Sequence, residues 1–69
     1  MAKIALAQMD RIIREATGLR VSETGKEALA EVLEDIAVDI AENAKKLATH
    51  AGRKTIRRDD IELAVKNVL

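Results

Sequence analysis

The residues of this chain that could bind a charged partner are mostly basic, and they gather in one short segment. Four cations and no acid fall within residues 51–58: Arg53, Lys54, Arg57 and Arg58. The spacing alone favours a solvated loop over a binding site, because basic residues are common near helix ends. Arg11 and Arg14 lie three residues apart on a helical pattern. This spacing alone is typical of ordinary surface residues.

The chain lacks most of the residue patterns that enzymes and metal sites require. The chain has no cysteine and a single histidine, His50, which makes a metal site improbable. Its one serine, Ser22, precedes a helical pattern and is expected to be an N-cap. The sequence contains no glycine-rich phosphate loop and no nucleophile–base pair. We therefore expect no enzyme, no metal, no cofactor and no small-molecule substrate.

The charges are unevenly distributed, although 12 basic and 12 acidic residues balance over the 69 residues. Residues 1–20 and 51–69 each carry a net charge of +2, and residues 21–50 carry −4. The centre of the chain is therefore acidic and both flanks are basic. No apolar run is long enough to span a membrane, and the N-terminus lacks the apolar block of a signal peptide. We expect a soluble, cytoplasmic protein without a membrane partner.

Residues 22–51 carry the longest helical pattern and contain no proline. Alanines form one apolar stripe at helical spacing, and beside it runs a stripe of larger residues that includes Leu29, Leu33, Ile36 and Ile40. Together the stripes cover roughly half of the helix, more than the ~100° stripe of an ordinary surface helix. A helix with so broad an apolar side must pack against more than one neighbour.

Shorter helices are predicted on either side, over about residues 2–17 and 58–68, with Gly18 and Gly52 as the residues that end the first and second helices. At 1.5 Å per residue the long helix would run about 40 Å, and each short helix would cover about half of that. Its middle would stay exposed until a second copy crossed it. The sequence thus predicts a single all-α domain over residues 1–69 that forms a dimer.

These elements and their residues together resemble the histone fold, most closely that of the small archaeal-type histones. Residues 50–56 (HAGRKTI) and 59–64 (DDIELA) are similar to the family's second loop and third helix. Residues 11–14 (RIIR) are similar to its first-helix motif, and residues 20–22 (RVS) to its first loop. The resemblance covers essentially the whole chain. It implies an intertwined handshake dimer, in which the first loop of one protomer lies beside the second loop of the other.

The resemblance also implies a function: sequence-nonspecific binding of double-stranded DNA, with bending, wrapping and compaction at the chromosome. In such binding, arginines enter inward-facing minor grooves and other groups hold phosphates. The expected DNA-binding residues are Arg11, Arg14, Arg20, Ser22, Arg53, Lys54, Thr55 and Arg57. Among them, Arg11 and Arg20 would lie at minor grooves. Arg53 would also pair with Asp60 and brace the second loop. Phosphates would be held by Lys54, Thr55, Arg14 and the Ser22 backbone.

Dimers of the family join further through a four-helix bundle, which implies a tetramer or larger assembly of this homodimer on DNA. The residues that match this interface are Leu47, His50, Asp60 and Leu63, and His50 would hydrogen-bond Asp60 of the neighbouring dimer. A histidine favoured by the helix C-terminus alone explains His50 equally well.

Some features depart from the family. The family usually has glycine at the position of Thr17, where it lets stacked dimers approach closely, so Thr17 disfavours continuous fibres. The N-terminal prolines and a C-terminal basic tail are absent, and zero net charge indicates weaker or more salt-sensitive DNA binding. One alternative is a histone-fold protein that heterodimerises with another protein and binds DNA weakly or not at all. Another is a designed or reconstructed histone-like sequence.

Overall fold

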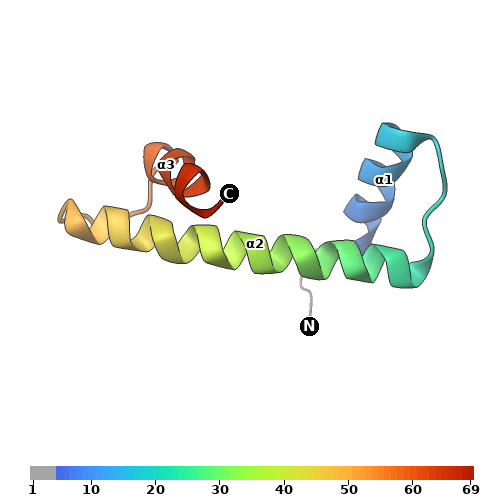
Figure 1. Cartoon of the computed structure of the whole chain (residues 1–69), viewed down its shortest axis with the longest axis horizontal. Helices are drawn as coiled ribbons and strands as arrows, with labels where there is room; N and C mark the ends of the chain where they lie inside the picture. Colours follow the sequence, from blue (N-terminus) through green and yellow to red (C-terminus); the bar gives the residue numbers. More distant parts are fainter. Residues whose placement is uncertain (1–4) are drawn as a thin grey trace. The chain divides into compact units, whose positions relative to one another are not determined.

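The computed structural model describes residues 5–69 and, within them, contains three α-helices and no strand (Figure 1). Helix α1 spans Leu6–Thr17, α2 spans Glu23–His50 and α3 spans Arg58–Val68. This order confirms the predicted all-α fold of short, long and short helices. The chain divides into two compact units, Met1–Asp35 and Ile36–Leu69, so that α2 contributes to both. No helix among the described residues has the length and apolar character needed to cross a bilayer.

Helix α1 begins later than predicted. Residues 2–4 of the expected helix lie outside the described part of the chain, and Ala5 is extended, with φ −62° and ψ 126°. Ala5 has no side-chain oxygen that could cap the helix, and the first turn contains no acid. Neither a cap nor an acid in the first turn therefore marks the start of the helix at Leu6 in the sequence.

The end of α1 is fixed by two adjacent residues. Gly18 has φ 73°, and its amide donates to the Arg14 carbonyl at 2.8 Å. The Thr17 hydroxyl donates to the Ile13 carbonyl at 2.7 Å and accepts from the Leu19 amide at 3.1 Å. Because Thr17 bonds to backbone on both sides of the corner, it ties the last turn of α1 to loop 1, residues 18–22.

Ser22 caps the N-terminus of α2, as the sequence predicted. Its Oγ accepts from the Gly25 amide at 3.0 Å, and its carbonyl accepts from the Lys26 amide at 3.0 Å. The helix itself begins at Glu23, one residue later than the predicted range. A Cβ on Gly25 would lie 2.9 Å from Cγ2 of Val21, so the close approach of loop 1 accounts for a glycine in this first turn.

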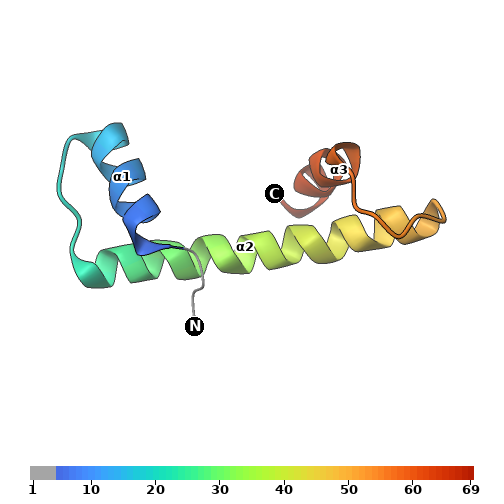
Figure 2. The same cartoon turned by 180° about the vertical axis from the view of Figure 1, so that it is seen from behind.

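In the first unit, α1 packs across the N-terminal part of α2 (Figures 1 and 2). Met9 of α1 is 3% exposed, and Ala30 of α2 is fully buried. The half-buried apolar residues of this unit are Leu6, Ile13, Val21, Leu29 and Leu33. One large side chain and one alanine are thus all the apolar residues that this unit buries among those described.

In the second unit, α3 packs on α2 through alanines, which let the two helices approach closely. Ala44, Ala48 and Ala64 are at most 3% exposed. At one edge of the contact, Nδ2 of Asn67 donates to Oδ1 of Asn43 at 3.0 Å. This polar contact joins α3 to α2 at the surface and adds no apolar burial.

Helix α2 ends at His50 in a Schellman motif, which leads into loop 2, residues 51–57. Gly52 has φ 75°, and its amide donates to the Thr49 carbonyl at 2.9 Å. The Arg53 amide donates to the Ala48 carbonyl at 2.9 Å. Only a residue that tolerates positive φ suits this position, so Gly52 determines where loop 2 leaves the helix.

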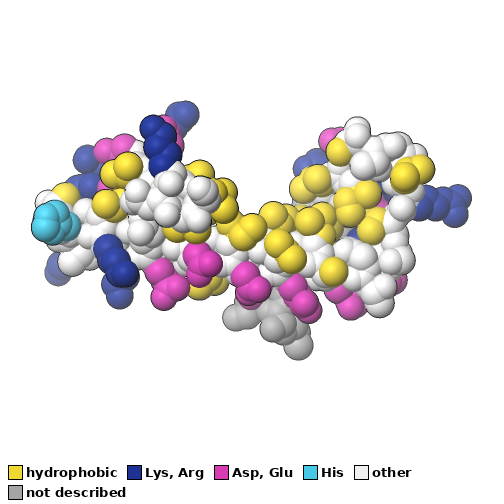
Figure 3. All heavy atoms as spheres, in the orientation of Figure 1, with side chains coloured by type: hydrophobic (Ala, Val, Ile, Leu, Met, Phe, Trp, Pro, Cys, Tyr) yellow, Lys and Arg dark blue, Asp and Glu magenta, His cyan; other side chains and the backbone are white. Residues whose placement is uncertain are grey.

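Much apolar surface remains open on each helix. No large side chain of the described residues is fully buried, and Ile12, Val32 and Leu63 are 46%, 54% and 48% exposed. Most apolar side chains of α2 lie on the side opposite its acidic side chains (Figure 3). The residues predicted to form a dimer core are each half-buried: Leu29, Leu33, Ile36 and Ile40. The dimer remains a prediction, and these residues keep accessible area with which a partner could pack.

Replacing Ser22 with alanine should lower the free energy of unfolding by about 1 kcal/mol, since the Gly25 amide loses its acceptor. The S22D variant, which keeps a side-chain oxygen at the cap, should retain most of the stability. Urea denaturation at one fixed protein concentration measures both changes. An S22A protein as stable as the original chain would show that this cap contributes nothing.

Candidate nucleic-acid interface

Loop 2 is built around Arg53 and Asp60, the two residues expected to pair. Nη1 of Arg53 donates to Oδ2 of Asp60 at 2.7 Å, and Nη2 donates to Oδ1 at 2.8 Å. Nη1 also donates to the Thr55 carbonyl at 3.1 Å. Such a two-pronged arginine–carboxylate contact fixes both distance and orientation. Arg53 therefore joins the middle of loop 2 to the first turn of α3.

Asp60 completes the brace by capping α3. Its Oδ2 accepts from the Arg57 amide at 2.9 Å, and its side chain is only 6% exposed. Hydrogen bonds from the Arg53 guanidinium, and next from the Arg57 amide, hold the pKa of Asp60 far below its usual value. The same pairing raises the pKa of Arg53. One buried carboxylate thus fixes the backbone of loop 2 from both ends.

The side chains that loop 2 offers to a partner are exposed. Lys54, Thr55 and Arg57 are all exposed, and Lys54 makes no ion pair within residues 5–69. Arg57 lies 3.8 Å from Asp59, between Nε and Oδ1, which is a long and weak contact. Lys54 is therefore the cation of this loop with the least compensation, whereas Arg53 is committed to the loop itself.

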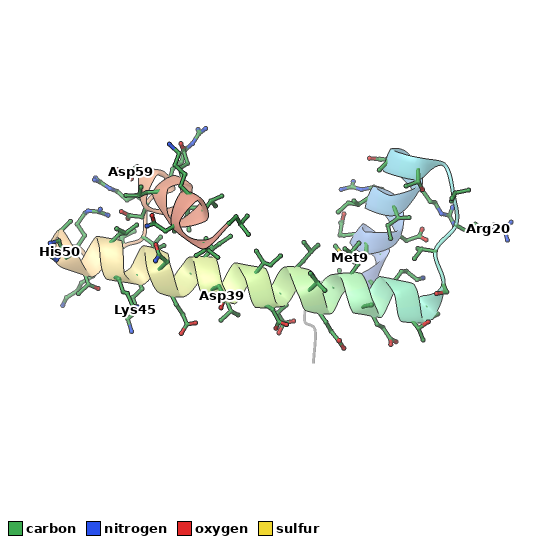
Figure 4. The ribbon with its side chains drawn as sticks, viewed as in Figure 1. Met9, Arg20, Asp39, Lys45, His50 and Asp59 are labelled. Atoms are coloured by element: carbon green, nitrogen blue, oxygen red, sulfur yellow. The ribbon has the colours of Figure 1, made fainter. Side chains whose placement is uncertain are left out.

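The first unit presents three arginines on α1 and loop 1. Arg11, Arg14 and Arg20 are exposed, and Arg20 extends outward from loop 1 (Figure 4). Arg11 and Arg20 have no acidic partner in the described part of the chain, but Nε of Arg14 lies 3.1 Å from Oδ2 of Asp10. Ser22 follows Arg20 by two residues, and its side chain is already used as the cap of α2.

The eight expected DNA-binding residues thus fall into two groups, one in each unit. The group in the first unit consists of Arg11, Arg14, Arg20 and Ser22, and the group in the second consists of Arg53, Lys54, Thr55 and Arg57. Within each unit, the fold brings these residues onto one helix–loop segment. That the two groups form one surface, across two chains, is still a prediction.

The residues expected at a dimer–dimer interface all belong to the second unit. Leu47 is half-buried, His50 is exposed at the end of α2 and Leu63 is 48% exposed. Asp60 already accepts three hydrogen bonds, two at Oδ2 and one at Oδ1. Because each carboxylate oxygen has two lone pairs, Oδ1 keeps one acceptor position that a histidine could use.

Two charged residues of the first unit were not anticipated from the sequence. The Lys26 side chain is only 18% exposed, and its Nζ lies 2.6 Å from Oε1 of Glu23. The hydrogen bond that Lys26 donates to Glu23, and to a smaller extent the charge of Asp10, raise the pKa of Lys26. Asp10 in turn holds Arg14. The i, i+3 and i, i+4 spacings of these pairs were the available signal, but such spacings are common on any charged helix.

Comparison with known proteins gives a consistent result. Residues 2–65 match the family described as histone-like transcription factor (CBF/NF-Y) and archaeal histone. The chain is 48% identical over 66 residues to one of the subunits of archaeal histone HAN1 from Thermococcus zilligii, covering 96% of this chain and 98% of that one. It is 41% identical over 66 residues to probable archaeal histone 3 of Methanocaldococcus jannaschii, with the same coverage.

Replacing Asp60 with asparagine should destabilise the protein more than replacing Arg58 with glutamine. Arg58 pairs with Glu62 on the open surface, with its own side chain 93% exposed, so its loss leaves no buried group unpaired. Thermal unfolding at neutral pH measures the difference. If D60N and R58Q had equal thermal unfolding midpoints, the Arg53–Asp60 pair would be dispensable for stability.

The loss of stability in the D60N variant should depend on pH. A depressed pKa in the folded state means that the Asp60 contribution is complete above about pH 4 and is lost as the pH falls through the folded-state value. The difference in unfolding midpoint between the original chain and D60N should therefore narrow as the pH is lowered below about 4. A constant difference would mean that the carboxylate charge does not contribute.

Proposed function

Because the chain belongs to the family of histone-like transcription factors and archaeal histones, we propose that it is a histone that binds double-stranded DNA. It does so as a dimer, without sequence preference, and bends or wraps the duplex at the chromosome. Both curated relatives carry archaeal histone in their names, and each aligns over nearly its whole length. The proposal includes one domain over residues 1–69 and no enzymatic role.

One observation carries this proposal: the cations expected to reach DNA include three that no acid of the described residues neutralises. These are Arg11 on α1, Arg20 in loop 1 and Lys54 in loop 2. By contrast, α2 holds seven acids and three lysines, so this helix is strongly acidic. Zero net charge therefore does not oppose DNA binding, since the charges are separated by element.

The proposed mechanism is neutralisation of phosphates with release of the counterions that surround DNA. Arg11 and Arg20 enter minor grooves, and Lys54, Thr55, Arg14 and the Ser22 backbone contact phosphates, as the family resemblance implies. Three uncompensated cations per chain make six per dimer. If all six reach DNA, the slope of log Kobs against log salt is about −5, on about 0.9 per neutralised phosphate.

The dimer is supported by what one chain leaves open. Loop 1 and loop 2 of one chain belong to different units, and the apolar side of α2 keeps accessible area in both. In a handshake dimer, loop 1 of one protomer pairs with loop 2 of the other, which would place Arg20 beside Lys54. Further association through Leu47, His50, Asp60 and Leu63 would give tetramers or larger assemblies on DNA.

A second candidate function is favoured by one specific observation. The relative that is 48% identical is named as one of the subunits of its histone. This chain could accordingly be one half of a heterodimer and contact DNA mainly through a different partner. Sedimentation of the chain alone, with mobility-shift titrations at two salt concentrations, separates the candidates. A folded dimer with salt-sensitive DNA binding supports the first, and a chain that stays monomeric and leaves DNA unshifted supports the second.

Replacing Arg20 and Lys54 together with glutamine should weaken binding to every duplex alike and flatten the salt slope. Four cations are then lost per dimer, so the slope should fall by about 3 to 4. The matched control is R58Q/K66Q, which removes the same charge from exposed positions of α3 outside the expected interface. Fluorescence anisotropy with several unrelated duplexes measures both.

Two results would contradict the proposed function. Equal losses in R20Q/K54Q and R58Q/K66Q would show that only the total charge matters. A preference for one sequence above roughly 10³-fold over random DNA would indicate direct reading of bases rather than a histone-like mode.

A further inference from the structure

The proposed function leaves unexplained an acid in the middle of the basic face of α1. Asp10 directly precedes Arg11, and its Oδ2 lies 3.1 Å from Nε of Arg14. An acid placed four residues before a base on a helix is the favourable order for such a pair. Arg14 is thus held by an acid of its own helix before any DNA arrives, unlike Arg11 and Arg20.

Asp10 is also held from the side of α2. Its side chain is 26% exposed, which is much less than the 61% of Arg14. The Lys26 side chain is 18% exposed, and the charge of Asp10 contributes to the raised pKa of Lys26, after the hydrogen bond to Glu23 and the charge of Glu23. Charges of alternating sign therefore run from α2 to α1: Glu23, Lys26, Asp10 and Arg14. Asp10 of α1 therefore lies near a cation of α2 as well as beside Arg14.

We propose that Asp10 restrains Arg14 and thereby lowers the affinity of this face for DNA phosphates. The inference rests on the proposed function and identifies a residue that sets its strength. A phosphate that approaches Arg14 either displaces Asp10 or shares the guanidinium with it. In the first case an ion pair is broken, and in the second a carboxylate stays close to phosphate oxygens. Both cases reduce the gain from the contact and the number of counterions released.

The Arg53–Asp60 pair shows why Asp10 differs from the other acids beside an arginine. Asp60 is buried, grips Arg53 with both oxygens and caps α3, so its role lies in the shape of loop 2. Asp10 makes one contact to Arg14, at the surface, and caps no helix. Its effect therefore falls on what Arg14 can bind.

Replacing Asp10 with asparagine tests the proposal, with E15Q as the matched control. Both variants remove one negative charge from α1, and Glu15 is exposed and forms no ion pair within the described residues. Anisotropy titrations of one random-sequence duplex at several salt concentrations give the affinity and the salt slope. D10N should bind more tightly than E15Q, by up to about fivefold for each Arg14 that is released, the range of an exposed ion pair. Its salt slope should be steeper by about 2 per dimer, from two released arginines.

The same substitutions in an R14Q background show whether Asp10 acts through Arg14. In the R14Q background, D10N should increase DNA affinity no more than E15Q does. This is the result expected for a coupled pair in a double-mutant cycle. Equal gains from D10N and E15Q, a D10N gain that persists without Arg14, or weaker binding by D10N would each overturn the proposal. Absence of binding by the original chain at low salt would instead refute the proposed function.

A second comparison tests the proposal without changing Asp10, and it applies if the D10N variant does not fold. R14Q and R11Q each remove one exposed arginine from α1 and leave Asp10 in place. Because Asp10 already compensates Arg14, R14Q should weaken DNA binding less than R11Q. An R14Q loss as large as that of R11Q would show that Asp10 imposes no restraint.

Discussion

The structure depends on one constraint: a single chain can bury only a small part of its apolar surface. The buried apolar residues among those described are Met9 and four alanines. Alanine and one methionine can close the contacts of α1 and α3 with α2, but they stabilise a small fold only weakly. The leucines and isoleucines of α2 remain half-buried. Any stable state of this chain must therefore cover them, and a second chain is the simplest way to do so.

Some basic residues form ion pairs within the fold, and others have no acidic partner among the described residues and can bind another molecule. Arg53 shapes loop 2 through Asp60, and Arg14 is occupied by Asp10. Arg11, Arg20 and Lys54 remain uncompensated within the described residues. A chain with no net charge can thus present cations to DNA, since its acids lie mainly along α2 or within these pairs.

The sequence predicted the parts of the fold that local chemistry determines. Ser22 had the side chain of an N-cap, Gly18 and Gly52 supplied the positive φ that ends a helix, and the apolar period gave the order of the helices. The pairing of Arg53 with Asp60 followed from the family resemblance. Asp10 and Lys26 were missed because long charged side chains choose among several neighbours at helical spacing, and only the packing of α1 on α2 decides. The start of α1 was placed too early because no cap marks it.

The central claim is that loop 1 and loop 2 form one DNA surface only when two chains combine. The chain has no cysteine, so single thiols can be introduced cleanly. One population would carry Arg20→Cys and another Thr55→Cys, and the two would be refolded together and treated with a short bifunctional thiol reagent. The account predicts efficient crosslinking between an R20C chain and a T55C chain. Crosslinking between R20C and T55C chains that is no more efficient than crosslinking between two R20C chains would contradict it.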